Sequence, residues 1–158
     1  MATTYEPIAT TTLSTTASSI EFTSISGSYT DLVLVGEGTT STETTLRLQF
    51  NSDTSSNYSS TYLLGDGSAA SSGRWSNQTV MYLFNWKTDR SNLICYINNY
   101  SNTTTYKTAL TRVNTTSGYA VANIGLWRSA SAITSIKISH SANFNSTTQF
   151  TLYGIASA

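Results

Sequence analysis

Hydrophobic and polar residues alternate with a period of two along most of the chain. In "TLRLQF" (45–50), large hydrophobic residues stand at every second position from Leu46, with Thr, Arg and Gln between them. "SIKIS" (135–139) and "QFTLYGI" (149–155) repeat the pattern. Successive side chains point to opposite faces of a β-strand, so each segment has one apolar face for a core. Helical spacing is missing and β-branched residues dominate, so the sequence predicts strands throughout.

Glycine-containing turns separate these segments at intervals of about ten residues, for example at Gly27, Gly65 and Gly118. Many short, evenly spaced strands without helices predict an all-β protein, a single-domain β-sandwich over residues 1–158. We expect a jelly-roll-like arrangement of about ten strands in two antiparallel sheets of about four or five strands each. The alternation places strands near residues 8–13, 19–25, 31–36, 44–51, 60–65, 79–86, 92–98, 104–113, 119–127, 133–140 and 148–156.

Three of these segments are apolar on both faces: "DLVLVG" (31–36), "TVMYLFNW" (79–86) and "NLICYIN" (92–98). A strand of this kind is covered on both sides, either within its own fold or by another subunit. In the segment 79–86, Met81 and Leu83 form the second apolar face. We therefore treat both as candidates for contact with a second copy or with a partner.

The N-terminal residues 1–12, "MATTYEPIATTT", have two interpretations. They form either an extended arm, anchored on a neighbouring molecule through Tyr5, Pro7 and Ile8, or an ordinary edge strand. Pro7 is the only proline, and a strand tolerates a missing N–H best at a sheet edge. The sequence leaves both interpretations open.

Composition narrows the choice of partners. Ser and Thr make up about a third of the chain, charged residues only 10%, and the formal net charge is zero. Without electrostatic attraction to nucleic acid or to anionic membranes, we expect neither as a partner. No signal peptide is visible, and no apolar stretch approaches the roughly 20 residues that span a bilayer, so we expect synthesis in a cytoplasm. The single cysteine, Cys95, excludes an intrachain disulfide, and its apolar neighbours predict a buried thiol.

The stretch "RLQFNSDTSSNYSSTYL" (47–63) contains Asn-x-Asp-x-Ser, the pattern of an oxygen-rich cation loop. A calcium loop of the EF-hand type needs several acidic ligands and a Glu at its twelfth position. Asp53 is the only carboxylate here, and the twelfth residue counted from Asn51 is Tyr62. Asn, Asp and Ser also close turns by bonding their own backbone. We interpret the stretch as a turn between two strands and expect neither a metal nor another cofactor.

Catalytic patterns are scarce. The one histidine, His140, follows an alternating strand, and no GxSxG motif accompanies it, so a structural role is favoured over that of a base. The carboxylates show no spacing that suggests an acid–base pair, and phosphate-binding and dinucleotide-binding motifs are missing. The sequence therefore predicts that the chain is not an enzyme.

A sugar site is the alternative to a purely structural surface. Trp75 follows a Gly/Ser-rich stretch that we expect to be a loop, with Arg74 beside it and Asp66 nearby. An exposed indole ring flanked by polar groups can stack on a sugar and bond its hydroxyls. The competing interpretation, which we favour, is that Trp75 covers the edge of the sandwich or packs on a neighbouring subunit.

Several stretches together resemble a known family. "MATTYEPIATTTLSTTASSIEFTSISGSYTDLVLV", "RLQFNSDTSSNYSSTYLLGDGS" and "GLWRSASAITSIKISHSANFNSTTQFTLYGI" are similar to small structural proteins of tailed bacteriophages, especially phages of marine bacteria and cyanobacteria. The most recognisable parts are residues 48–58 and "FTLYGI" (150–155), which are strand and turn motifs. The resemblance extends over nearly the whole chain.

The resemblance implies a virion protein with a β-sandwich fold, made in the cytoplasm of the bacterial host. We expect a capsid decoration protein, non-enzymatic, which binds the major capsid protein or other virion proteins on the outer capsid surface and stabilises the shell. A homo-oligomer, with a trimer favoured, suits local three-fold positions. The alternative is a tail-fibre or head-fibre module that recognises host surface glycans through Asp66, Arg74 and Trp75.

Overall fold

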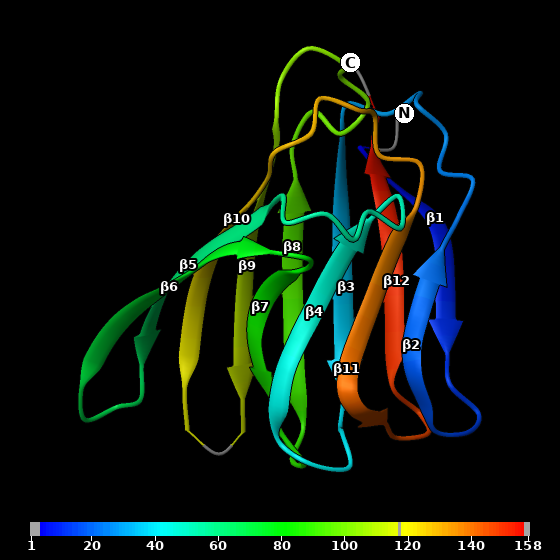
Figure 1. The fold of residues 1–158 in the computed structure, drawn as a ribbon. Helices are drawn as coiled ribbons and strands as arrows, with labels where there is room; N and C mark the ends of the chain where they lie inside the picture. The colour runs from blue at the N-terminus through cyan, green and yellow to red at the C-terminus, as the bar shows by residue number, and fades with distance from the viewer. Residues whose placement is uncertain (1–3, 117, 157–158) are drawn as a thin grey trace.

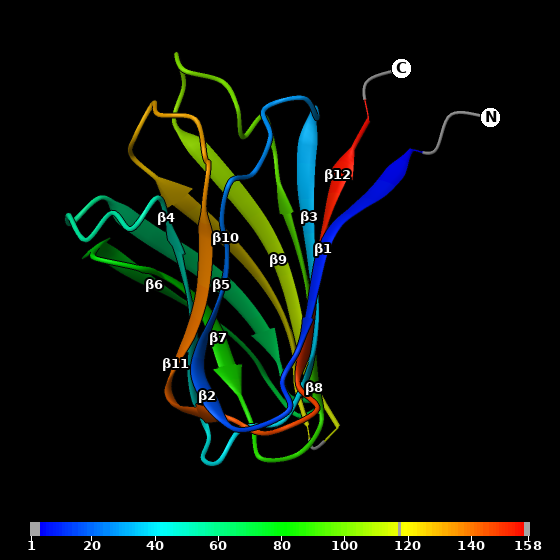
Figure 2. The same cartoon turned by 90° about the vertical axis from the view of Figure 1, so that its right-hand side faces the viewer.

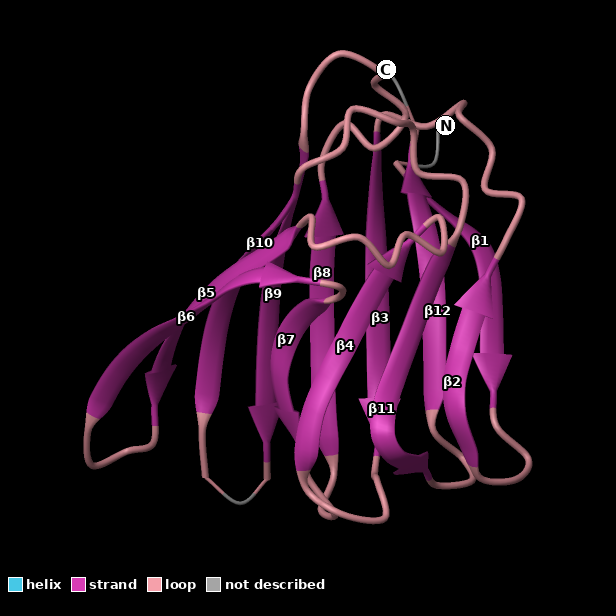
Figure 3. Cartoon of the chain, viewed as in Figure 1, coloured by secondary structure: helices cyan, strands magenta, loops and turns pink. Residues whose placement is uncertain are grey.

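The computed structural model describes residues 4–116 and 118–156, and within them every regular element is a β-strand (Figure 1, Figure 3). The strands are β1 (Tyr5–Thr12), β2 (Ala17–Phe22), β3 (Asp31–Gly38), β4 (Thr44–Phe50), β5 (Tyr58–Gly65), β6 (Ala70–Gln78), β7 (Met81–Trp86), β8 (Ser91–Ile97), β9 (Lys107–Thr115), β10 (Ala120–Trp127), β11 (Ile136–Phe144) and β12 (Gln149–Ile155).

The strands form two antiparallel sheets that pack face to face (Figure 1, Figure 2). The large sheet has eight strands in the order β1-β12-β3-β8-β9-β10-β5-β6, and the small sheet has four in the order β2-β11-β4-β7. The prediction of an all-β sandwich with two antiparallel sheets is confirmed. The expectation of nearly equal sheets is wrong, because β1 and the β5–β6 hairpin extend the large sheet beyond the small one.

The core lies between the sheets and follows the alternation in the sequence. Leu46, Leu48 and Phe50 of β4 are fully buried, as the period-two pattern predicts. Cys95 is also fully buried, and burial raises the pKa of its thiol to about 12. Trp86 stacks on Phe150 at 5.3 Å between ring centroids, so the two sheets meet through a pair of aromatic rings.

All eleven predicted strands are present near their predicted positions, but β6 was missed. This strand, "ASSGRWSNQ", lies at the edge of the large sheet and pairs only with β5. Its Ser and Gly residues have low strand propensity and resemble a loop in the sequence. The expectation that Trp75 follows a loop is therefore wrong, because pairing with β5 makes the segment a strand.

A β-bulge in β7 changes which of its residues face the core. Leu46 pairs with Phe84 and Arg47 pairs with Tyr82, so Leu83 is an extra residue. Phe84, next to the bulge, has a φ of 110°. Because the bulge resets the alternation, Leu83 points into the core together with Met81 before it and Trp86 after it.

Met81, Leu83 and Trp86 are all fully buried. The prediction that Met81 and Leu83 form an outward contact face is therefore wrong. Regular alternation would have turned Trp86 away from these two side chains, and the bulge removes that opposition.

The N-terminal residues from Tyr5 form an edge strand and not a free arm. β1 pairs with β12 from Tyr5–Ile155 to Thr12–Gln149. A bulge lies between Pro7 and Ala9, and the extra residue, Ile8, packs partly buried against the core. Tyr5 and Pro7 are exposed. The bulge and the proline both make this edge a poor template for further pairing.

Gly36 leaves room for an aromatic ring of the neighbouring strand. It pairs with Phe150, whose ring occupies the position that a Cβ at residue 36 would take. We expect Gly36→Ala to lower the free energy of unfolding by about 1–2 kcal/mol through overpacking, measured by urea denaturation. Gly65→Ala is the matched control, since its Cβ would meet no atom within 4 Å. Equal stability of the two variants would contradict the packing of Phe150 over β3.

Candidate functional site

The face of the large sheet that points away from the small sheet is uncovered, and we call it the open face (Figure 2). Leu63 of β5 is 64% exposed and Ile124 of β10 is 59% exposed. Val35 of β3 and Leu110 of β9 are exposed on the same side. These are large aliphatic side chains on a protein whose remaining surface is rich in Ser and Thr.

The strand register arranges the open face in rows that run across the strands. One row passes from β3 to β5 through Val35, Ile94, Arg112, Ala122 and Leu63, each residue paired with the next. The adjacent row contains Tyr96, Leu110 and Ile124. A polar row on the other side begins with the directly opposed pair Asn92 and Asn114. The open face is thus an apolar band with a polar border.

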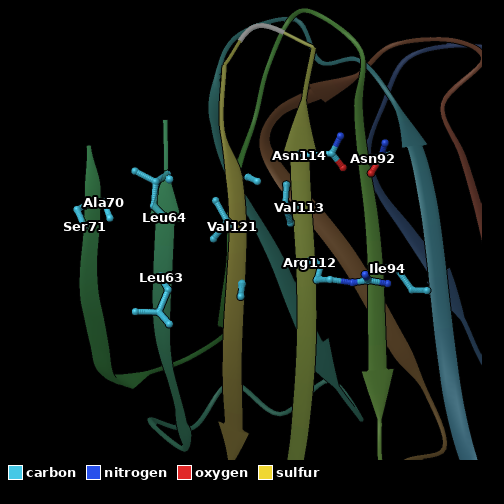
Figure 4. A pocket seen from close by; sticks show the side chains of 13 residues that line it. Leu63, Leu64, Ala70, Ser71, Asn92, Ile94, Arg112, Val113, Asn114 and Val121 are labelled. Atoms are coloured by element: carbon cyan, nitrogen blue, oxygen red, sulfur yellow. The ribbon is translucent and has the colours of Figure 1, made fainter. Parts of the chain in front are cut away.

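Two shallow hollows lie next to each other in the open face and together cross the strands. The larger has a volume of about 990 Å³ and extends over β8, β9, β10, β5 and β6 (Figure 4). The smaller, of about 330 Å³, extends over β12, β3 and β8. Both are lined by Asn92 and Ile94, so they meet at β8. We use the name transverse groove for the combined hollow.

One cation, Arg112, lies in the transverse groove and forms no ion pair with any residue that the structure describes. Arg112 is exposed and extends across β8 toward Ile94 (Figure 4). Within residues 4–116 and 118–156 the ion pairs are Lys87–Glu43 at 3.8 Å and Arg90–Glu37 at 2.9 Å, and Arg112 belongs to neither. The Glu37 carboxylate at the end of the smaller hollow is thus already paired with Arg90. The groove therefore combines aliphatic side chains with one guanidinium group that has no counter-charge.

The amides beside Arg112 are also available for binding. Asn92 and Asn114 are exposed and opposed across β8 and β9. In the part of the chain that the structure describes, neither side chain makes a hydrogen bond. Each amide offers both donors and an acceptor. The arrangement suits recognition by hydrogen bonds and apolar contact.

The residues predicted for a sugar site are not brought together. Arg74 pairs with the exposed Thr61 and lies on the open face, whereas Trp75 pairs with the buried Ser60 and points to the other side. Asp66 lies in the turn beyond the pair Gly65–Ala70, which is five positions along β5 from Ser60, or roughly 16 Å.

Asp66 has a structural role in that turn. It accepts hydrogen bonds from the backbone N–H groups of Ser68 at 2.8 Å and Ala69 at 2.7 Å. These bonds lower the pKa of its carboxyl group, the one to Ala69 most strongly. Asp66 therefore closes the β5–β6 hairpin.

Trp75 packs at the edge of the sandwich. Its ring lies 4.9 Å from Tyr62 and 5.4 Å from Tyr82, measured between ring centroids. Phe84 and Tyr119 continue the cluster at 5.3 Å from each other. These five aromatic residues hold β6 and β5 of the large sheet against β7 of the small sheet.

His140 is a structural residue of β11. Its Nε2 donates to the carbonyl oxygen of Thr44 at 2.8 Å, because Nδ1 accepts the backbone N–H of Ala142 at 3.3 Å. The side chain is buried, and burial lowers the pKa of the imidazole, which is therefore neutral at pH 7.

The Asn51–Asn57 loop is a turn, as predicted. The Asp53 carboxylate accepts hydrogen bonds from Trp127 Nε1 at 2.7 Å, the Ser55 N–H at 2.8 Å and Asn57 Nδ2 at 3.1 Å. The carboxylate oxygens of Asp53 are thus occupied by hydrogen-bond donors of the protein itself. Among the described residues, no group of three or more His, Cys, Asp or Glu could hold a metal ion. The same residues contain no helix that is long and apolar enough to cross a membrane.

Sequence reasoning did not identify the groove residues Asn92, Arg112 and Asn114. One signal was present, because the segments 31–36 and 92–98 are apolar on both faces and only one face of each is covered by the small sheet. The pattern therefore indicated that β3 and β8, which line the smaller hollow, have a second apolar face. The polar residues gave no signal, since they alternate with core residues like any outward-facing residue of a strand.

Comparisons with known proteins assign no family to the chain. No protein-family model matches the chain, and no curated protein matches its sequence. Among solved structures, the Caenorhabditis elegans galectin LEC-6 is similar with a TM-score of 0.46 and 9% identity, over 94% of this chain and 96% of the galectin. An exo-inulinase from Aspergillus awamori is similar with a TM-score of 0.42 and 11% identity, over 96% of this chain. The chain spans only 29% of the inulinase.

Proposed function

We propose that the protein is a non-enzymatic structural protein of a bacteriophage virion, and that it decorates the capsid by docking its open face on the outer surface of the shell. The observation that carries the proposal is the exposed apolar band. Of the six large hydrophobic side chains that are exposed among the described residues, five lie on the open face by strand register: Tyr5, Val35, Leu63, Leu110 and Ile124. Contiguous exposed apolar surface of this kind marks interaction sites.

The sequence pattern supports the same use of this face. β3 and β8 are apolar on both sides, which indicates that both sides are covered in the functional state. The small sheet covers one side, and a partner would cover the other. The resemblance to tailed-phage structural proteins implies a place on the virion, and we propose the capsid as that partner. Many copies on one lattice would multiply weak individual contacts. A homo-oligomer, with a trimer favoured, stays a prediction of the same proposal.

The test is co-sedimentation of the purified chain with capsids of the phage that encodes it. We expect Leu63→Asp and Ile124→Asp each to weaken binding by about tenfold or more, because each places a charge in an apolar contact. Ser18→Asp is the matched control, since it adds the same charge at an exposed position of β2 in the small sheet. Thermal unfolding should be unchanged in all three variants.

Two results would contradict the proposal. Capsid binding at full strength in a double variant that combines Leu63→Asp and Ile124→Asp would exclude the open face as the docking surface. Mass spectrometry of purified virions provides the second check, because a decoration protein is present in proportion to the major capsid protein. A copy number far below that proportion would place the chain on the tail or at a vertex.

A further inference from the structure

We infer that the transverse groove binds one extended segment of a partner protein, in which a carboxylate is flanked by aliphatic side chains. The identification of the partner as a capsid protein rests on the proposed function. The chemistry of the segment rests on the groove alone.

The shape of the groove favours an extended segment. It crosses from β12 to β6, which is six strand spacings, or roughly 29 Å, the length of about eight or nine extended residues. A second copy presenting the same face would set one hollow against another and leave the volume unfilled. A ridge or strand of a different protein surface fills it.

A segment in the groove runs across the strands and does not extend the sheet, since the strands from β12 to β5 that it crosses are paired on both sides. Recognition therefore depends on side chains of the open face. Leu63, Ile94 and Ala122 form a floor that suits aliphatic side chains.

Charge complementarity assigns the carboxylate. Arg112 has no acidic partner among the described residues, and Glu37 at the end of the groove is bound by Arg90 at 2.9 Å. A guanidinium group binds a carboxylate through two parallel N–H···O bonds. An Asp or Glu side chain, or a C-terminal carboxylate, would complete the site at Arg112.

The neighbouring amides favour a peptide over a sugar. Asn92 and Asn114 together present donors and acceptors that match the N–H and C=O groups of an extended peptide. The larger hollow is lined by aliphatic and polar side chains, without an aromatic ring among its described lining residues. A sugar ring beside Arg112 in the larger hollow would therefore lack the flat aromatic surface on which it stacks, and the aromatic lining residue of the groove, Tyr153, belongs to the smaller hollow.

The test is selection of linear random peptides on the immobilised full chain. We expect enriched peptides to contain Asp or Glu close to an aliphatic residue. Arg112→Gln should remove the preference for acidic residues. It should also weaken the binding of an enriched peptide by about tenfold, which corresponds to the loss of roughly one charge-assisted hydrogen bond. Arg74→Gln is the matched control, because Arg74 lies on the same face outside the groove and also forms no ion pair in the described chain.

Three outcomes would overturn the inference: no enrichment, an acidic preference that survives Arg112→Gln, or binding of acidic glycans without binding of peptides. The capsid assay separates this inference from the proposed function. If the chain binds capsids but enriches no peptide, the peptide inference is refuted and the capsid proposal stands. If it enriches acidic peptides but does not bind capsids, the capsid proposal is refuted and the peptide inference stands.

Discussion

Replacing Trp86 with alanine is expected to lower the free energy of unfolding by about 3–5 kcal/mol, the largest effect that we predict for one substitution. Trp86 is fully buried, stacks on Phe150 at 5.3 Å and meets Phe144 edge-on at 5.8 Å between ring centroids. Removing the indole ring leaves a cavity between the sheets that rigid strands cannot fill. Urea denaturation followed by circular dichroism measures the change.

Trp86→Phe is the informative control. Among the described residues the indole N–H has no hydrogen-bond partner, so phenylalanine removes an unsatisfied donor while keeping an aromatic ring against Phe150. We expect less than half the loss seen with alanine. If Trp86→Ala unfolds no more easily than Trp86→Phe, the central position of this ring in the core is contradicted.

Replacing Asp53 with alanine is expected to lower the free energy of unfolding by about 2 kcal/mol at neutral pH. The substitution leaves the buried indole N–H of Trp127 without its acceptor and removes the acceptor of the Ser55 N–H. Trp127 stacks on Tyr58 at 6.2 Å and contacts Phe50, so a shift of its ring disturbs this end of the core.

The loss at Asp53 should depend on pH. Partial burial alone would raise the pKa of the Asp53 carboxyl group, but the hydrogen bonds from Trp127, Ser55 and Asn57 outweigh it and lower the pKa from 3.8 to about 2. The folded state stabilises the ionised carboxylate more than the unfolded chain does. The contribution of Asp53 to the free energy of unfolding is therefore fully present above about pH 4 and disappears as the pH falls toward 2.

Unfolding measured across this range should therefore show the wild-type and Asp53→Ala curves converging in acid. Asp66→Ala serves as the control, because Asp66 bonds only exposed backbone N–H groups and its removal should cost less at neutral pH. A difference between wild type and Asp53→Ala that stays constant down to pH 2 would refute the role of the ionised carboxylate.

Local sequence patterns were sufficient for the position of most strands. Eleven strands follow from alternation and glycine turns, because a strand with one buried face needs a hydrophobic residue at every second position. The turn at Asp53 and the buried Cys95 also follow from their immediate neighbours. β6 was missed because its identity depends on pairing with β5 and not on its own Ser- and Gly-rich residues.

The alternative of a sugar site at Arg74 and Trp75 also depended on local sequence alone. Proximity in the sequence suggested that Arg74 and Trp75 act together, but a strand sends consecutive side chains to opposite faces. Once the segment is known to be a strand, the two residues are separated by the sheet. The Met81 and Leu83 prediction was wrong because a single extra residue in β7 reset the alternation.

The sequence by itself determined that this protein is built from strands, which residues form most of its core, and which strands are apolar on both faces. Only the tertiary structure decided that the sheets have eight and four strands, and that one apolar face is left uncovered. The transverse groove belongs to this second class, since Leu63, Ile94 and Arg112 come from three different strands, β5, β8 and β9. Their alignment depends on inter-strand register, which is set by long-range pairing and is invisible in any local pattern.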